Sequence, residues 1–298
     1  MLLKNVRAKK QGSVCGDYCH SGKGCGNVAY ATSNPSKIIN VQQESKCETT
    51  NTSVWTIVGS TILTMQDRRV LESEEWLSDK HIHAAQQLLK KQHPQIAGLQ
   101  DTILQVTGVF DVHGSREFVQ CLNLGSSHWM VVSTLGCTSG VVRVYDSLHF
   151  SPSMSVKKTI ARMIHTKEQA IKIEEMAVRM QKGGNDCGLF AIAMVTTLCS
   201  GDDPVLVHYE QSRMRQHVIR ALEEKQLLPF PSKPARRKAC VVRRRERVPV
   251  FCVCRLPDDG RLMVQCSRCK EWYHNNCVKL PETIIKNDNV PWFCESCK

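Results

Sequence analysis

The stretch Gln181-Lys182-Gly183-Gly184-Asn185-Asp186-Cys187-Gly188 is a polar, glycine-rich loop that runs directly into the apolar segment Leu189-Phe190-Ala191-Ile192-Ala193-Met194-Val195. This pattern predicts a buried helix that begins at Cys187. A thiol at a helix N-terminus lies beside unpaired backbone N–H groups and the positive end of the helix dipole. Both favour the thiolate, which is the nucleophilic form of cysteine. Asp186 is the expected N-cap, because its carboxylate can accept bonds from those N–H groups.

Three further residues supply the groups that a nucleophilic cysteine requires. His128 begins one strand-like run and Asp146 ends the next. If the two runs form a hairpin, Asp146 can orient the His128 imidazole as the base for Cys187. Gln181 lies six positions before Cys187, where its amide can donate to an oxyanion beside the Cys187 backbone N–H. Each residue alone is common in structural roles, but together they indicate a thiol hydrolase.

The order His128-Trp129, Asp146, Gln181, Asp186-Cys187-Gly188 resembles that of the ubiquitin-like-protein-specific cysteine proteases, the sentrin/SUMO protease type. Papain-type enzymes use a similar constellation in a different chain order, with the cysteine first. The resemblance covers residues 54–231 and implies an α+β, papain-like cysteine protease fold of the ubiquitin-like-protease type.

Two tryptophans carry the resemblance to the substrate side of the site. The segment Glu75-Trp76-Leu77-Ser78-Asp79 is similar to the Trp-Leu-Asn-Asp segment near the start of the family domain. The resemblance implies that Trp76 and Trp129 clamp a narrow tunnel for the di-glycine tail of a substrate. Without the resemblance, Trp76 would be read as a core aromatic.

The composition is that of an ordinary globular protein with a basic charge. The 298 residues are 42% hydrophobic and carry a formal net charge of +12. No apolar run is long enough for a membrane span or a secretory leader, so we expect no membrane partner. The 16 cysteines are therefore expected to be thiols and zinc ligands in a reducing compartment.

Residues 1–53 are expected to be a disordered leader that contains cysteines. The alternative is a small zinc site, although the spacing fits no established zinc motif. Its candidate ligands are Cys15, Cys19, His20, Cys25 and Cys47.

Residues 232–249 have the composition of a basic linker, in which eight basic residues face only Glu246. Two basic clusters separated by a few residues also resemble a bipartite nuclear localisation signal, so we expect the protein in the nucleus. A weak contact with nucleic-acid phosphates is a secondary expectation. The basic residues are Lys233, Arg236, Arg237, Lys238, Arg243, Arg244, Arg245 and Arg247.

Residues 250–298 contain eight metal-ligand side chains in four closely spaced pairs, which is the number that two tetrahedral zinc ions require. Such a short segment cannot build an adequate hydrophobic core, so zinc binding is expected to supply its folding energy. The pairs are Cys252 and Cys254, Cys266 and Cys269, His274 and Cys277, and Cys294 and Cys297.

The order of four cysteines, one histidine and three cysteines resembles the PHD finger and differs from the RING finger. Trp292, two residues before Cys294, matches the core tryptophan of that family. The resemblance implies interleaved ligands. One zinc ion would be held by Cys252, Cys254, His274 and Cys277, and the other by Cys266, Cys269, Cys294 and Cys297.

Phe251, Met263 and Trp272 occupy positions that resemble the walls of the aromatic cage in methyl-lysine-reading PHD fingers. Asp258 and Asp259 would receive basic side chains of a histone tail. The alternative is that Trp272 and Met263 only cover the small core.

The resulting functional hypothesis is a cysteine protease or isopeptidase that cleaves after the Gly-Gly-like terminus of a ubiquitin-like, SUMO-like modifier. Its PHD finger would hold it at chromatin by reading a histone tail with a methylated lysine. One alternative is a non-catalytic chromatin reader whose protease domain is only a scaffold. Another is a transposon-derived protease with a different protein substrate.

Overall fold

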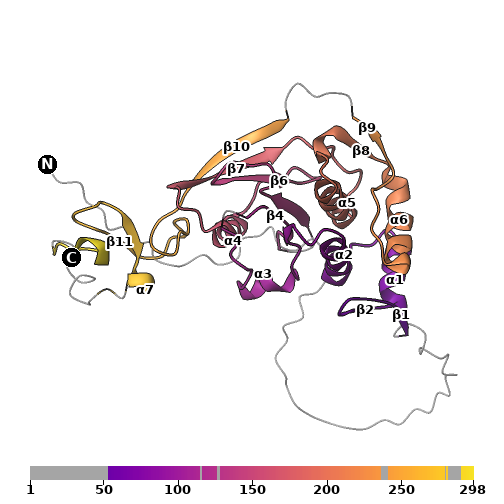
Figure 1. Ribbon diagram of the computed structural model, residues 1–298, viewed down its shortest axis with the longest axis horizontal. Helices are drawn as coiled ribbons and strands as arrows, with labels where there is room; N and C mark the ends of the chain where they lie inside the picture. Colours follow the sequence, from indigo (N-terminus) through magenta and orange to yellow (C-terminus); the bar gives the residue numbers. More distant parts are fainter. Residues whose placement is uncertain (1–52, 115, 126–127, 236–240, 279, 281–289) are drawn as a thin grey trace, which may run out of the picture. The chain divides into compact units, whose positions relative to one another are not determined.

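The computed structural model describes residues 53–114, 116–125, 128–235, 241–278, 280 and 290–298 (Figure 1). The predicted leader, including its cysteines and His20, lies outside the described residues, apart from Ser53. Residues 236–240 of the predicted linker also lie outside them.

A six-stranded mixed sheet forms the centre of the fold (Figure 1). Its strand order is β10-β7-β6-β5-β4-β3. The pairs β4–β5, β5–β6 and β10–β7 are antiparallel, whereas β3–β4 and β6–β7 are parallel. The strands are β3 (Ala97–Gly98), β4 (Phe118–Asn123), β5 (Trp129–Ser133), β6 (Val141–Tyr145), β7 (Ala170–Met176) and β10 (Val242–Pro249).

Alternating side chains of the sheet enter two hydrophobic cores on its two faces. On β5, Trp129 and Val131 join the first core, whereas Met130 and Val132 join the second. The first core contains helix α5 (Cys187–Cys199), all thirteen residues of which are buried. The second contains α4 (Met154–Ile164). The predicted buried helix at Cys187 is confirmed, and so is the α+β class.

Most of the remaining elements of this domain surround the first core, whereas Leu104 of the short helix α3 packs against the second. The hairpin β1 (Val54–Val58) and β2 (Thr61–Thr64) precedes α1 (Met65–Glu72) and α2 (Asp79–Gln92). Helix α6 (Gln211–Glu224) packs against α1 and α5. The short elements are α3 (Ile103–Thr107), η1 (Pro204–Leu206), β8 (Val207–Tyr209) and β9 (Ser232–Pro234).

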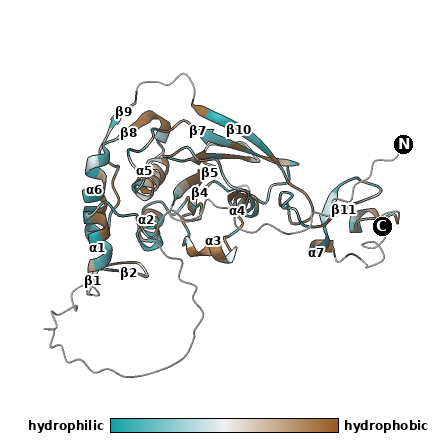
Figure 2. Ribbon diagram, turned by 180° about the vertical axis from the view of Figure 1, so that it is seen from behind, coloured by the Kyte–Doolittle hydropathy of each residue, from teal (hydrophilic) through white to brown (hydrophobic). Residues whose placement is uncertain are grey.

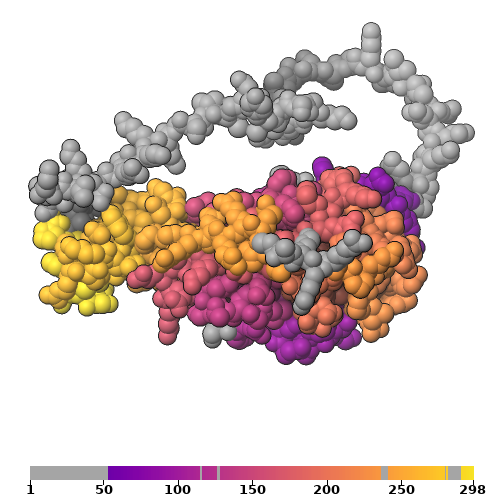
Figure 3. Space-filling model, turned by 90° about the horizontal axis from the view of Figure 1, so that it is seen from above, coloured from indigo at the N-terminus to yellow at the C-terminus, as the bar shows by residue number. Residues whose placement is uncertain are grey.

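The second half of the predicted basic linker is an edge strand of the main sheet. Strand β10 lies in the hydrophilic colour in Figure 2 and on the viewed surface in Figure 3. On β7, Glu175 pairs with Arg243, and Glu174 with Arg245 at 3.1 Å. Val248 is buried in the second core. The sequence of β10 resembled a linker because highly charged strands are unusual. Here the opposing carboxylates of β7 make the pairing of the two strands favourable.

The C-terminal residues follow β10 without a spacer. Val250 and Leu256 pack in the second core, and the Val250 N–H donates to the Gln169 carbonyl at 3.1 Å. Arg255 Nε donates to the Thr166 carbonyl at 3.0 Å. The module contains β11 (Met263–Gln265), β12 (Trp272–His274), α7 (Asn275–Val278) and η2 (Glu295–Cys297).

Candidate active site and metal centres

The β5–β6 pairing brings His128 and Asp146 together. His128 precedes β5 and Asp146 follows β6, and the antiparallel register places Val131 opposite Tyr145. The two side chains therefore meet at one end of the sheet, as the sequence predicted. His128 Nε2 lies 2.9 Å from Asp146 Oδ1.

Backbone N–H groups hold the Asp146 carboxylate in place. The N–H of Leu148 donates to Oδ1 at 2.7 Å, and that of Phe150 donates to Oδ2 at 3.2 Å. The Phe150 ring also meets the His128 ring edge to face, with centroids 5.0 Å apart. The imidazole is thus fixed on one side by a carboxylate and on another by an aromatic ring.

The environment of His128 favours the imidazolium. Burial opposes the charge, but the hydrogen bonds and negative charges of Asp146 and Cys187 outweigh it and raise the pKa of His128 to about 9. Because Nε2 is taken by Asp146, Nδ1 is the ring nitrogen left for the Cys187 thiol. The histidine can therefore carry a proton at neutral pH beside a thiolate.

Cys187 is the first residue of α5, but the expectation that the Asp186 carboxylate caps this helix is wrong. Asp186 occupies the N-cap position and makes no side-chain capping bond. Its Oδ1 accepts from Arg215 Nη2 and its Oδ2 from Gln211 Nε2, both at 2.6 Å. The charge-assisted bond from a guanidinium is stronger than one from a neutral backbone N–H, which accounts for the difference.

Gln181 lies in the loop before Cys187 with both ends of its amide engaged. The Ser147 hydroxyl donates to Gln181 Oε1 at 2.6 Å, and Gln181 Nε2 donates to the Gly183 carbonyl at 3.0 Å. Ser147 is fully buried. It was missed from the sequence because a serine after a strand is commonplace, although its position directly after Asp146 was a weak signal.

The two tryptophans have different environments. Trp76 is 54% exposed, and its Nε1 donates to the Gly184 carbonyl at 3.1 Å, so it lies against the loop before Cys187. Trp129 is only 3% exposed, and its Nε1 donates to the Leu77 carbonyl at 3.1 Å. Trp76 therefore presents an accessible ring face, whereas Trp129 is buried and holds the segment that follows Trp76 in place through its bond to Leu77.

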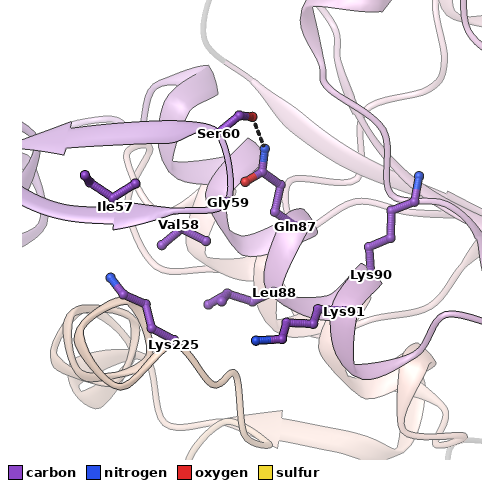
Figure 4. Close-up of a pocket in the computed structure, with 9 residues that line it drawn as sticks. All are labelled: Ile57, Val58, Gly59, Ser60, Gln87, Leu88, Lys90, Lys91 and Lys225. Atoms are coloured by element: carbon purple, nitrogen blue, oxygen red, sulfur yellow. Dashed lines mark hydrogen bonds between the residues drawn. The ribbon is translucent and has the colours of Figure 1, made fainter.

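A separate pocket of about 420 Å³ lies between the β1–β2 hairpin and the C-terminal turn of α2 (Figure 4). Its lining includes Leu88, Lys90, Lys91 and Lys225. None of the candidate catalytic residues lines it. Trp76 precedes the opposite end of α2, so this pocket is distinct from the candidate active site.

The eight predicted metal ligands form two clusters, in the interleaved arrangement that the sequence predicted. The ligand atoms of each cluster lie within 4.8 Å of one another. Cys254 Sγ is 3.3 Å from His274 Nδ1, and Cys269 Sγ is 3.9 Å from Cys294 Sγ. Sulfur ligands about 2.3 Å from a tetrahedral zinc ion lie about 3.8 Å apart, so these donor sets fit zinc.

The proposed cage residues lie on two parts of the module. The β11–β12 register places Met263 opposite His274 and Gln265 opposite Trp272. Met263 and Trp272 are therefore diagonal neighbours on one face of this small sheet. Phe251 lies in an isolated bridge with Leu256. All three proposed cage side chains are partly exposed.

The expectation that Asp259 receives a basic side chain of a histone tail is wrong, because basic residues of this chain already occupy it. Its side chain is 3% exposed and pairs at 2.7 Å with both Arg261 and Lys158 of α4. These charges hold the pKa of Asp259 well below its usual range, despite burial. Asp258 accepts instead from the N–H of Gly260 at 2.9 Å.

Residues 252–297 match the PHD-finger family model, so a PHD finger with two zinc sites occupies this segment. Set1 complex component spp1 of Schizosaccharomyces pombe is 44% identical over 50 residues, which are 16% of this chain and 11% of that protein. Lysine-specific demethylase 7A of Xenopus tropicalis is 41% identical over 51 residues, which are 17% of this chain and 5% of that protein. The chain thus matches only a small part of these relatives.

Solved structures of a SUMO protease align with part of this chain. The C-terminal Ulp1 protease domain in complex with Smt3, the yeast ortholog of SUMO, has a TM-score of 0.45 and 16% identity over 60% of this chain and 90% of that chain. Ulp1 with its catalytic cysteine oxidised to a sulfenic acid has a TM-score of 0.43 and 16% identity over 56% of this chain and 86% of that chain.

Among the described residues, the helices are too short or too polar for one of them to cross a bilayer.

Proposed function

We propose that this chain is a cysteine peptidase in which Cys187 is the nucleophile and His128 and Asp146 complete the catalytic group. The observation that carries the proposal is the buried His128–Asp146 hydrogen bond of 2.9 Å, together with the raised pKa of His128 beside Cys187. A protonated imidazole next to a cysteine at a helix N-terminus is the arrangement that favours a thiolate nucleophile.

The reaction proceeds by acyl transfer. The Cys187 thiolate attacks the substrate carbonyl carbon, and His128 gives its proton to the leaving amine as the C–N bond breaks. His128 then removes a proton from water, which attacks the thioester and releases the carboxylic acid and the thiolate. Asp146 keeps the imidazole oriented throughout. The Cys187 N–H and the Gln181 side chain stabilise the oxyanion of each tetrahedral intermediate.

The proposed substrate is the C-terminal Gly-Gly-like tail of a ubiquitin-like, SUMO-like modifier, free or conjugated. The motif order favours this class, and Trp76 offers an exposed ring beside Gly184. At Gly183 and Gly184, the adjacent residues apart, no atom of the described part of the chain lies within 4 Å of a Cβ position, so a substrate backbone has room beside the loop. Glycines in the substrate tail would allow the closest approach.

The PHD finger is proposed to bring this activity to chromatin in the nucleus. Trp272 and Met263 on one face of its sheet, with Phe251, would form the walls for a methylated lysine of a histone tail. The relatives support a chromatin role, since they are named as a Set1 complex component and a lysine-specific demethylase. The arginines of β10 would make at most weak contacts with nucleic acid, because Arg243 and Arg245 are paired with carboxylates.

The decisive experiment offers the purified chain a panel of ubiquitin-like proteins that carry C-terminal electrophiles. At least one probe should label the wild-type protein covalently, and Cys187→Ala should not be labelled. Cys137→Ala is the matched control, because Cys137 is a partly exposed thiol that has no proposed role and should leave labelling unchanged. Equal labelling of Cys187→Ala, or no labelling by any probe, would leave the non-catalytic reader as the better description.

A further inference from the structure

The Asp186 carboxylate next to Cys187 is bound by helix α6 through both of its oxygens. Arg215 Nη2 reaches Oδ1 and Gln211 Nε2 reaches Oδ2, each at 2.6 Å. The Arg215 and Asp186 side chains are 16% and 18% exposed. The pair is therefore largely shielded from solvent, where a charge-assisted bond is stronger than at an open surface.

Arg215 also fixes the segment that leads to Trp76. Its Nη1 donates to the Val70 carbonyl at 2.8 Å, and its Nη2 donates to the Glu75 carbonyl at 2.9 Å. One guanidinium thus joins three parts of the chain: helix α6, the end of α1 with the following loop, and the residue before Cys187. A lysine could not make all these bonds at once, since it lacks the planar fork of donors.

Gln211 adds a second attachment on the same loop. Its Oε1 accepts from the Lys182 N–H at 2.9 Å, and its Nε2 donates to the Lys182 carbonyl at 2.8 Å as well as to Asp186. The loop between Gln181 and Cys187 is therefore held at both ends by α6.

An aspartate at an N-cap position ordinarily accepts bonds from backbone N–H groups of the first helical turn. At α5 such a bond would go to the N–H of Gly188 or Leu189, and not to the Cys187 N–H that the proposed oxyanion uses. A free carboxylate there would also place a second negative charge beside the Cys187 thiolate, which disfavours it. This second charge would oppose the reaction.

We propose that Arg215 is a positioning residue for the reaction proposed above, and that Gln211 assists it. By drawing the Asp186 carboxylate toward α6, Arg215 keeps it from capping α5 and neutralises its charge beside Cys187. The role of Arg215 in catalysis rests on the proposed function, but the effect of Arg215 on the charge beside Cys187 is measurable without a protein substrate.

The test is the pH dependence of alkylation at Cys187, followed with iodoacetamide and mass spectrometry of the Cys187 peptide. In Arg215→Met the pH of half-maximal alkylation should rise by roughly one unit, the lower end of the shift that a nearby charge produces. Arg215→Lys should shift less. Arg213→Met is the matched control on α6, because Arg213 is exposed and, within the described residues, its one ion pair is with Glu210, and its profile should equal that of the wild type.

The double variant Asp186→Asn, Arg215→Met separates electrostatics from folding. This variant lacks the Asp186 charge that Arg215→Met leaves without its arginine partner. Its alkylation profile should therefore return toward that of the wild type. The inference is overturned if Arg215→Met leaves the profile unchanged, or if adding Asp186→Asn does not restore it. Should Arg215→Met not fold by circular dichroism, Gln211→Leu decides the question, with a smaller upward shift expected and an unchanged profile contradicting the inference. Failure of the proposed function is seen separately, as absent labelling of the wild type by the electrophilic probes.

Discussion

The Ser147 hydroxyl donates a hydrogen bond of 2.6 Å to Gln181 Oε1, and so determines which way the Gln181 amide faces. With its oxygen bound by Ser147, the amide can direct only N–H groups toward the loop before Cys187. One of them already meets the Gly183 carbonyl. A residue directly after Asp146 thereby orients a residue of the proposed oxyanion site, so the two parts of the site are connected.

Ser147→Ala should therefore lower turnover without abolishing it. One neutral hydrogen bond is worth about 1 kcal/mol, which corresponds to roughly a fivefold loss. Gln181→Ala should cost roughly 10²–10³-fold, as expected for one oxyanion donor. Steady-state hydrolysis of a labelled ubiquitin-like substrate measures both, with the exposed α4 residue Ser155→Ala as the control. Undiminished turnover in Gln181→Ala would mean that another group stabilises the oxyanion.

The pH profile should reflect the raised pKa of His128. Since the imidazolium persists up to about pH 9, kcat/KM should hold through neutral pH and decline above about 9. Asp146→Asn removes the carboxylate charge beside His128 Nε2, so the alkaline limb should move to lower pH. An alkaline limb at the same pH in this variant would argue against the proposed role of Asp146.

The same shift predicts a pH-dependent contribution to folding stability. The pKa of His128 is raised from 6.5 in the unfolded chain to about 9. Its contribution is thus fully present below about pH 6.5 and is lost as the pH rises through about 9. Denaturant unfolding of the wild type and of His128→Ala, compared at pH 6 and pH 9.5, measures it. The stability difference between the two proteins should be larger at pH 6, and the reverse order would contradict the assignment.

Zinc removal should loosen the edge of the main sheet as well as the PHD finger. The chain runs from β10 directly into the first zinc site, and Val248, Val250 and Leu256 share the second core. After chelation, hydrogen exchange should accelerate in 242–249 and in the module, while α5 stays protected. Cys252→Ser should lower the protection of β10 from hydrogen exchange more than Cys266→Ser does. Cys252 belongs to the zinc site that directly follows β10, and Cys266 belongs to the other site. Unchanged protection of β10 would show that the sheet edge is independent of zinc.

The reader function should depend on Trp272. A quaternary ammonium keeps its charge and is attracted to a tryptophan face, an interaction worth about 2 kcal/mol when desolvated. Calorimetry should find tighter binding of a trimethyl-lysine histone peptide than of the unmethylated peptide to the full chain. Trp272→Ala should remove this difference and retain two zinc ions, since Trp272 is not a ligand. Equal binding of both peptides by the wild type would mean that Trp272 only covers the core.

Several features followed from local sequence alone. The four closely spaced pairs of Cys and His indicated two zinc ions, because two tetrahedral sites need eight ligands, and the resemblance to the PHD finger implied the interleaved sets that the structure has. The apolar run after Cys187 determined a buried helix, since its residues are apolar all round. The hairpin that joins His128 to Asp146 followed from two β-branched runs connected by a short turn.

Tertiary structure decided the remaining features through partners that are distant in the chain. Asp186 meets a local rule for helix capping, but Arg215, 29 positions away, offers a stronger charge-assisted bond. Residues 242–249 read locally as a solvated linker and form a strand because Glu174 and Glu175 face them from β7. Local patterns specify what a segment prefers when it is alone. A carboxylate or a strand edge, however, binds the partner that the fold brings within reach. Arg215 thereby determines the shape of the loop before Cys187, and the carboxylates of β7 determine the edge of the sheet.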